Sequence, residues 1–162
     1  MKAFEAAVLQ LGAALRARGW RLATAESCTG GLIAAACTSV AGSSDWFERG
    51  FVSYSNAAKQ TLLGVDAGLI AAQGAVSEAV ARAMAEGALA SSDVDLTVAV
   101  TGIAGPGGAV PGKPVGTVWL AVARRDGATQ SELLQLAGDR SRVRELTVEV
   151  ALNRLLAAAG SP

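Results

Sequence analysis

Segments typical of buried strands alternate with helical segments along this chain, and this alternation limits the possible folds more than any other feature. The clearest strand is residues 95–101, Asp-Leu-Thr-Val-Ala-Val-Thr. Further strands are predicted at 20–25 and 50–54, and helices are predicted at 4–18, 31–40, 57–63, 78–89 and 139–159. Strands separated by helices favour an α/β fold with helices on both faces of a sheet. We therefore expect a three-layer α/β/α sandwich.

The end of the chain predicts that the sheet is mixed but mostly parallel. Residues 116–124 and 129–136 are expected to be strands joined at Asp126-Gly127, which is a hairpin signal. A hairpin makes its two strands antiparallel, so the sheet cannot be all parallel. The 162 residues contain no internal repeat and no linker, and 51% of them are hydrophobic. This predicts a single domain over 1–162 with one substantial core.

The charge balance limits the partners that we expect. The chain has 14 basic and 14 acidic residues, so its formal net charge is zero. A balanced chain gives no general reason to expect binding to nucleic acid or to an anionic membrane. No apolar stretch approaches the roughly 18 residues that span a bilayer, and the N-terminus lacks the apolar core of a signal peptide. A cytoplasmic protein is therefore expected.

The chain contains no histidine, which narrows the chemistry available to it. Histidine is the usual general base, the usual partner of a catalytic serine and the commonest zinc ligand. The two cysteines, Cys28 and Cys37, do not suggest a disulfide scaffold in a chain without a secretory signal. Hydrolytic chemistry here needs another base.

Ser27 lies where the first strand is expected to turn into a helix, in Glu26-Ser27-Cys28-Thr29-Gly30-Gly31. A helix N-terminus offers unpaired N–H groups that can hold a phosphate or stabilise an oxyanion. Gly30 and Gly31 would allow a ligand or a neighbouring backbone to come close. The alternative is that Ser27 and Thr29 only cap the helix. Cys28 is a rival nucleophile, although small buried cysteines are common.

Lys59 is a candidate base. If Asn56 is the N-cap, Lys59 falls in the first turn of its helix, where the helix dipole should lower its pKa. The alternative is a solvated surface lysine. Tyr54, the only tyrosine, sits at a predicted strand end, where it either stacks on a ring or closes the core.

The loop over 102–114 follows the most apolar strand, which ends at Thr101. Ligands in open α/β sheets bind beyond the carboxyl ends of strands, so Thr101 and Gly102 are candidate contacts. The loop lacks the Gly-Lys-Ser/Thr ending of a phosphate-binding P-loop. It is either a mobile surface loop or a lid over a substrate.

Arg140 follows Gly138-Asp139 at the start of the last predicted helix. An arginine at a helix N-terminus suits a phosphate, because its donor fork adds to the free N–H groups. The alternative is a salt-bridged surface arginine. Arg142 and Arg144 are weaker candidates for the phosphate.

Several segments together resemble one known family. They are Ala25-Glu26-Ser27-Cys28-Thr29-Gly30-Gly31, Gly42-Ser43-Ser44 with Trp46-Phe47, Gly50-Phe51-Val52-Ser53-Tyr54-Ser55-Asn56 with Lys59, Gly74-Ala75-Val76-Ser77-Glu78, Thr101-Gly102-Ile103-Ala104-Gly105-Pro106, Lys113-Pro114-Val115-Gly116-Thr117-Val118 and Gly138-Asp139-Arg140. In this order they resemble the C-terminal domain of the CinA family, which includes stand-alone nicotinamide-nucleotide amidases of the PncC type. The resemblance runs from about residue 5 to residue 158.

The resemblance implies hydrolytic deamidation of nicotinamide mononucleotide to nicotinate mononucleotide and ammonia, within pyridine nucleotide recycling. It implies no metal and no organic cofactor. It places the nucleophile at Ser27 and the general base at Lys59. Substrate contacts are expected at Tyr54, Thr101, Arg140, Thr29, Gly30, Gly31 and Gly102. A homo-oligomer, a dimer or higher, is also expected.

The alternative function is a nucleotide-binding or regulatory module of the CinA type with negligible catalysis, because a fold does not fix a function.

Overall fold

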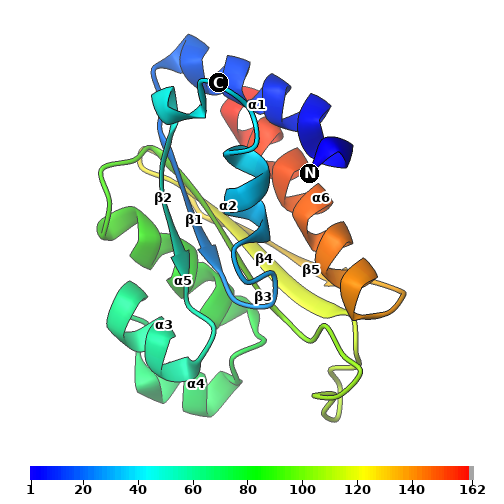
Figure 1. The fold of residues 1–162 in the computed structure, drawn as a ribbon. Coiled ribbons are helices and arrows are strands. Elements are labelled where there is room, and N and C mark those ends of the chain that lie inside the picture. Colours follow the sequence, from blue (N-terminus) through cyan, green and yellow to red (C-terminus); the bar gives the residue numbers. More distant parts are fainter. Residues whose placement is uncertain (161–162) are drawn as a thin grey trace.

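The middle layer of the molecule is a mixed sheet of five strands in this computed structural model, which describes residues 1–160 (Figure 1). The strands are β1 (Leu22–Glu26), β2 (Phe47–Val52), β3 (Leu96–Gly102), β4 (Thr117–Arg124) and β5 (Gln130–Gln135), and their order is β2-β1-β3-β4-β5. β1 pairs in parallel with β2 and with β3, whereas β4 is antiparallel to both of its neighbours. All strands except β4 therefore run in the same direction, and the expected mixed, mostly parallel sheet is confirmed.

Helices cover both faces of this sheet (Figure 1). One face carries α1 (Glu5–Arg18), α2 (Leu32–Cys37) and α6 (Arg140–Gly160), and the other carries α3 (Asn56–Leu63), α4 (Ala67–Gln73) and α5 (Glu78–Ala90). Two single 3₁₀ turns, Lys2–Phe4 and Ser43–Asp45, precede α1 and β2. The three-layer α/β/α sandwich expected from the sequence is confirmed.

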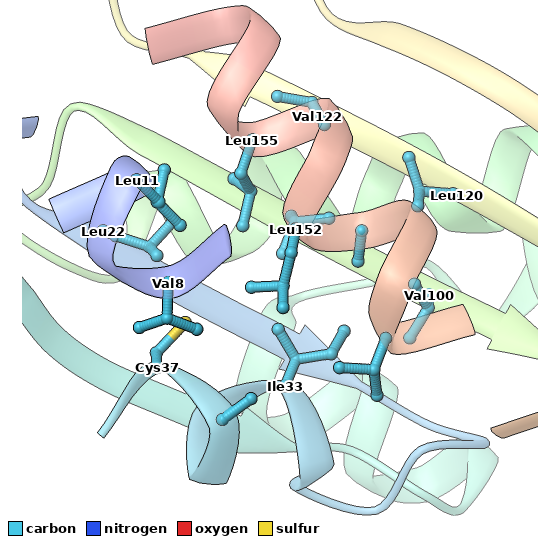
Figure 2. Close-up of a cluster of buried hydrophobic side chains, with 14 of the residues drawn as sticks. Val8, Leu11, Leu22, Ile33, Cys37, Val100, Leu120, Val122, Leu152 and Leu155 are labelled. Atoms are coloured by element: carbon cyan, nitrogen blue, oxygen red, sulfur yellow. The ribbon is translucent and has the colours of Figure 1, made fainter. Parts of the chain in front are cut away.

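A hydrophobic core fills the space between the sheet and each helical layer. On the α1, α2 and α6 side it is built from branched side chains such as Leu11, Ile33 and Leu152, which point toward the strands (Figure 2). On the α5 side, alanines such as Ala85 and Ala99 let the helix approach the sheet closely. All of these side chains are fully buried, so both faces of the sheet are fixed against a helical layer.

Two predicted elements differ from the observed ones by three residues at one end. The helix predicted at 31–40 ends at Cys37: the next residue, Thr38, leaves helical geometry, and its hydroxyl donates to the carbonyl oxygen of Ala34, 2.8 Å away. The strand predicted at 50–54 instead covers Phe47–Val52 at the edge of the sheet. Gly50 lies within this strand, where a Cβ atom would come within 2.9 Å of the Thr24 hydroxyl on β1.

Helix α4 was not predicted from the sequence. It is a seven-residue helix of sequence Ala-Gly-Leu-Ile-Ala-Ala-Gln, and Ile70 is its buried residue. Two turns with so few large apolar side chains give no readable helical period.

Among residues 1–160, no helix is both long enough and apolar enough to cross a membrane.

Candidate active site

Three parallel strands end level with one another, and polar residues lie at all three ends. Ser27 directly follows β1, Tyr54 follows β2 by two residues, and Thr101 is the second-last residue of β3. Glu26, the last residue of β1, pairs with Val52, the last residue of β2, and with Val100, two residues before the end of β3. Carboxyl ends of strands are where open α/β sheets bind ligands.

Ser27 and Lys59 are in direct contact at this edge. The Lys59 ammonium nitrogen, Nζ, lies 3.0 Å from the Ser27 hydroxyl oxygen, Oγ. Lys59 comes from the first turn of α3, whose N-cap is Ser55 rather than the expected Asn56: the Ser55 hydroxyl accepts from the Ala58 N–H at 3.0 Å. The side chain of Lys59 is 1% exposed. The alternative of a solvated surface lysine is therefore wrong.

Backbone carbonyl groups complete the surroundings of Lys59. Its Nζ donates to the carbonyl oxygens of Ser53, at 3.1 Å, and Tyr54, at 2.9 Å. Lys59 forms no salt bridge within residues 1–160. Burial without a carboxylate partner disfavours the charged form, so the pKa of Lys59 is lowered from its ordinary value. Desolvation by burial is the leading cause of this lowered pKa.

The turn that carries Ser27 is closed by its own backbone. The Gly30 N–H donates to the Ser27 carbonyl oxygen at 3.0 Å, and Gly30 and Gly31 have φ angles of +60° and +103°. These left-handed conformations favour glycine and carry the chain into α2, which begins at Leu32. The two glycines thus shape the turn, and neither lines the cavity described below.

Glu26 holds the start of α2 and is a residue that the sequence did not single out. Its buried carboxylate accepts from the N–H groups of Ile33, at 2.9 Å, and Ala34, at 3.0 Å, and from the Thr29 hydroxyl, at 2.5 Å. The N-terminus of α2 is therefore occupied by Glu26 and is not open to a phosphate. Neither Ser27 nor Thr29 caps α2, and the fully buried Thr29 side chain is not placed for direct contact with a substrate.

A cavity of about 260 Å³ opens beside Ser27 and Lys59. Six of the nine predicted site residues line it: Ser27, Lys59, Tyr54, Thr101, Gly102 and Arg140. Its remaining walls are Cys28, Asn56, Ala75 and Val76 and the loop residues Ile103, Ala104, Gly105, Gly107 and Gly108. The first part of the loop over 102–114, up to Gly108, thus forms one wall of the cavity.

Thr101 joins two parts of the cavity wall. Its side chain is 1% exposed, and its hydroxyl donates to the Ala75 carbonyl oxygen at 2.9 Å. This contact ties the end of β3 to the segment before α5. Ala75 and its neighbour Val76 were not predicted as site residues, because small apolar side chains carry no chemical signal.

The three arginines at the start of α6 have different surroundings. The Arg140 guanidinium lines the cavity and donates to the Gly105 carbonyl oxygen, at 2.9 Å, and to the Tyr54 phenolic oxygen, at 3.2 Å. Arg142 is paired with Glu145 on the surface, at 2.9 Å. Arg144 donates to backbone oxygens of the turn that carries Ser27. Only Arg140 lines the cavity.

Cys28 lies beside Ser27 in the sequence and touches the same cavity. Its side chain is 5% exposed, and burial raises the pKa of its thiol to about 12. A thiol must lose its proton to become a strong nucleophile, so the surroundings of Cys28 disfavour that role at neutral pH.

Within residues 1–160, no group of three or more Asp, Glu, Cys or His side chains is arranged to hold a metal ion.

Comparison with known proteins identifies the family. The sequence model of the CinA C-terminal domain matches residues 5–159. This chain belongs to the CinA C-terminal domain family. The solved structure of the competence/damage-inducible protein CihA from Agrobacterium tumefaciens has a TM-score of 0.93 to this chain at 44% identity, and the match covers 95% of this chain and 94% of that one. A Klebsiella pneumoniae protein of the CinA superfamily has a TM-score of 0.92 at 38% identity, covering 96% of both chains.

Relatives in the CinA family include short and long proteins. The nicotinamide-nucleotide amidohydrolase PncC of Enterobacter agglomerans is 54% identical, over 84% of this chain and 83% of its own length, and that of Escherichia coli K12 is 51% identical, over 90% and 88%. A CinA-like protein of Mycolicibacterium gilvum is 59% identical over 85% of this chain, but the match covers only 32% of that protein. The short relatives confirm the expectation of an amidohydrolase.

Proposed function

We propose that this chain hydrolyses the carboxamide of nicotinamide mononucleotide to give nicotinate mononucleotide and ammonia, with Ser27 as nucleophile and Lys59 as general base. The observation that carries the proposal is the 3.0 Å contact between Lys59 Nζ and Ser27 Oγ, in which Lys59 is buried and forms no salt bridge within residues 1–160. The short relatives are named for this activity, and they match this chain over most of their length. We place the reaction in pyridine nucleotide recycling.

The two carbonyl groups around Lys59 orient its lone pair. A neutral amine has two N–H donors and one lone pair, whereas a carbonyl oxygen can only accept. The carbonyl oxygens of Ser53 and Tyr54, at 3.1 and 2.9 Å, take both N–H groups. The lone pair is then left to accept the proton of the Ser27 hydroxyl. When Lys59 is protonated, its three N–H groups match the same three oxygens, so the site suits both states of a base that also acts as an acid.

The reaction follows in two halves. Ser27 Oγ attacks the carboxamide carbon while its proton moves to Lys59, and the N–H of Cys28, which lines the cavity, donates to the oxyanion. The C–N bond then breaks as Lys59 returns its proton to the leaving nitrogen, which departs as ammonia. Water hydrolyses the resulting ester on Ser27, again with Lys59 as base, and the acid product leaves.

Residues at the cavity mouth fit the rest of the nucleotide. Arg140 carries a donor fork at the first turn of α6, and a phosphate would exchange its present carbonyl and phenol partners for charged oxygens. The Tyr54 side chain is 59% exposed beside Arg140 and offers a flat face for a ring. No step of this mechanism uses a metal or an organic cofactor. The partner that we propose is thus a small mononucleotide, in the cytoplasm.

Ammonia release from nicotinamide mononucleotide, nicotinamide riboside and free nicotinamide tests the substrate. We expect turnover of the mononucleotide, and Arg140→Ala should raise its KM much more than it lowers kcat. Arg154→Ala, which alters a remote arginine paired with Glu132, is the matched control. Folded protein that binds the mononucleotide without releasing ammonia would instead support the regulatory module.

A further inference from the structure

Arg144 lies one helical turn after Arg140 but contacts a different part of the site. Its Nε donates to the Cys28 carbonyl oxygen at 3.1 Å, and its Nη2 donates to the Thr29 carbonyl oxygen at 3.2 Å. Arg144 is half-buried, and within residues 1–160 it has no carboxylate partner. A Cβ atom at Gly30 would lie 3.5 Å from Nη2, so the turn and the guanidinium are packed against each other. Two donors of this arginine, Nε and Nη2, therefore bind backbone carbonyl oxygens of the turn that follows Ser27.

By binding the Cys28 carbonyl oxygen, Arg144 also fixes the direction of the N–H in the same peptide unit. In a trans peptide, the C=O and the N–H of one unit point in opposite directions. The Cys28 carbonyl shares its unit with the Thr29 N–H, so a guanidinium holding the carbonyl turns that N–H to the other side. The Gly30 N–H closes the turn onto Ser27, whereas among residues 1–160 the N–H groups of Cys28 and Thr29 have no backbone oxygen as acceptor. Thr29 is fully buried and does not line the cavity, so the Cys28 N–H, on a residue that does line it, is the donor left for an oxyanion.

We propose that Arg144 is a positioning residue that holds the Ser27–Gly30 turn so that the Cys28 N–H receives the oxyanion; this inference rests on the proposed function. The two peptide units that Arg144 holds carry the Thr29 and Gly30 N–H groups, and the Gly30 N–H closes the turn onto Ser27, so both contacts fix the turn on which the Cys28 N–H lies. The same contacts distinguish Arg144 from a phosphate ligand. Its two nearest donors are already used by carbonyl groups, and it does not line the cavity.

Steady-state kinetics of Arg144→Lys and Arg144→Ala test the proposal, with Arg142→Ala as the control two residues earlier on the same helix. Arg144 holds the oxyanion donor without being one, so its loss should lower kcat by about 10- to 100-fold, less than the roughly 100- to 1000-fold for removal of a donor outright. KM and the pKa seen in the pH profile should hardly change, since Arg144 contacts neither the substrate cavity nor Lys59. Lysine lacks the planar fork and should keep only part of the activity. Millimolar guanidinium should partly rescue Arg144→Ala, and Arg142→Ala should resemble the wild type.

A raised KM with unchanged kcat would overturn the proposal and make Arg144 a phosphate contact. Unchanged kinetics in both variants would overturn it as well. If Arg144→Ala does not fold, Arg144→Lys carries the test. Hydrogen exchange at the Gly30 N–H separates this inference from the proposed function, because it needs no turnover. Exchange should accelerate in Arg144→Lys and not in Arg142→Ala, and unchanged exchange contradicts the inference even if the wild type releases no ammonia.

Discussion

Lys59 shows how far a residue's role depends on contacts that are distant in the sequence. Its position in the first turn of a helix was readable, but a lysine there is usually solvated. What removes it from water is its packing against the end of β2 and against Ser27, 32 residues earlier. No local sequence pattern indicates that packing. The same holds for Arg144, which reaches a turn more than 100 residues away.

The lowered pKa of Lys59 predicts the pH dependence of the reaction. The neutral amine is the base, so kcat/KM should rise with pH while Lys59 loses its proton and should level off above the pKa of Lys59. That pKa should lie below the ordinary lysine value of about 10.4. The measurement is kcat/KM for nicotinamide mononucleotide from pH 5 upward. Lys59→Arg, which stays protonated, should lose the activity together with the rising limb. A wild-type kcat/KM that is flat from pH 5 to alkaline pH would contradict the role of Lys59.

At the scale of elements, the start of α2 is stabilised by a residue of the preceding strand. Capping residues are expected next to a helix, and Ser55 before α3 and Ser77 before α5 follow that rule. Glu26 lies six residues before α2 and reaches it because the turn folds back. The existence of the helix was predictable from the sequence, but the residue that caps it was not.

Glu26→Gln should lower the free energy of unfolding. The amide keeps one acceptor oxygen but turns an NH₂ group toward a helix N–H, which leaves a buried donor without a partner, at a cost of about 1–3 kcal/mol. Urea unfolding followed by circular dichroism measures the change. Glu86→Gln is the control, because Glu86 is exposed on α5. Equal stabilities of the two variants would show that Glu26 does not hold α2.

Gly87 fixes how closely α5 packs on α3. A Cβ atom at this position would lie 2.0 Å from the Leu63 carbonyl oxygen. Gly87→Ala gains about 1 kcal/mol of helix propensity. Displacing the backbone of α3 costs about 1–3 kcal/mol, so we expect a net loss of stability. Gly127→Ala, which has only ordinary contacts, is the control in the same thermal unfolding measurement. A Gly87→Ala variant more stable than the wild type would contradict this packing.

At the scale of the whole molecule, the alternation of strands and helices was enough to predict the sandwich, because a parallel sheet needs helices on both faces. It did not predict α4 or the bounds of β2. These are short segments at the periphery, and packing against the rest of the molecule determines where they begin and end. The polar strand ends predicted where a site would lie. They did not predict that Thr29, Gly30 and Gly31 shape the turn instead of the cavity, since that depends on Glu26.

We also propose that the chain forms a homo-oligomer. Its alanine-rich surface and its family are the grounds for this expectation. Size-exclusion chromatography with light scattering should give a dimer or a higher multiple of the 16.2 kDa protomer at micromolar concentration. A particle of 16.2 kDa across that range would contradict the proposal.

Ser27 should form an ester with the substrate during turnover. The direct measurement is acid quenching during turnover of nicotinamide mononucleotide, followed by mass spectrometry of the intact protein and its peptides. We expect an acyl group on Ser27 in the wild type and in Cys28→Ala, and neither adduct nor ammonia in Ser27→Ala. An acyl group on Cys28, or near wild-type ammonia release by Ser27→Ala, would contradict this expectation.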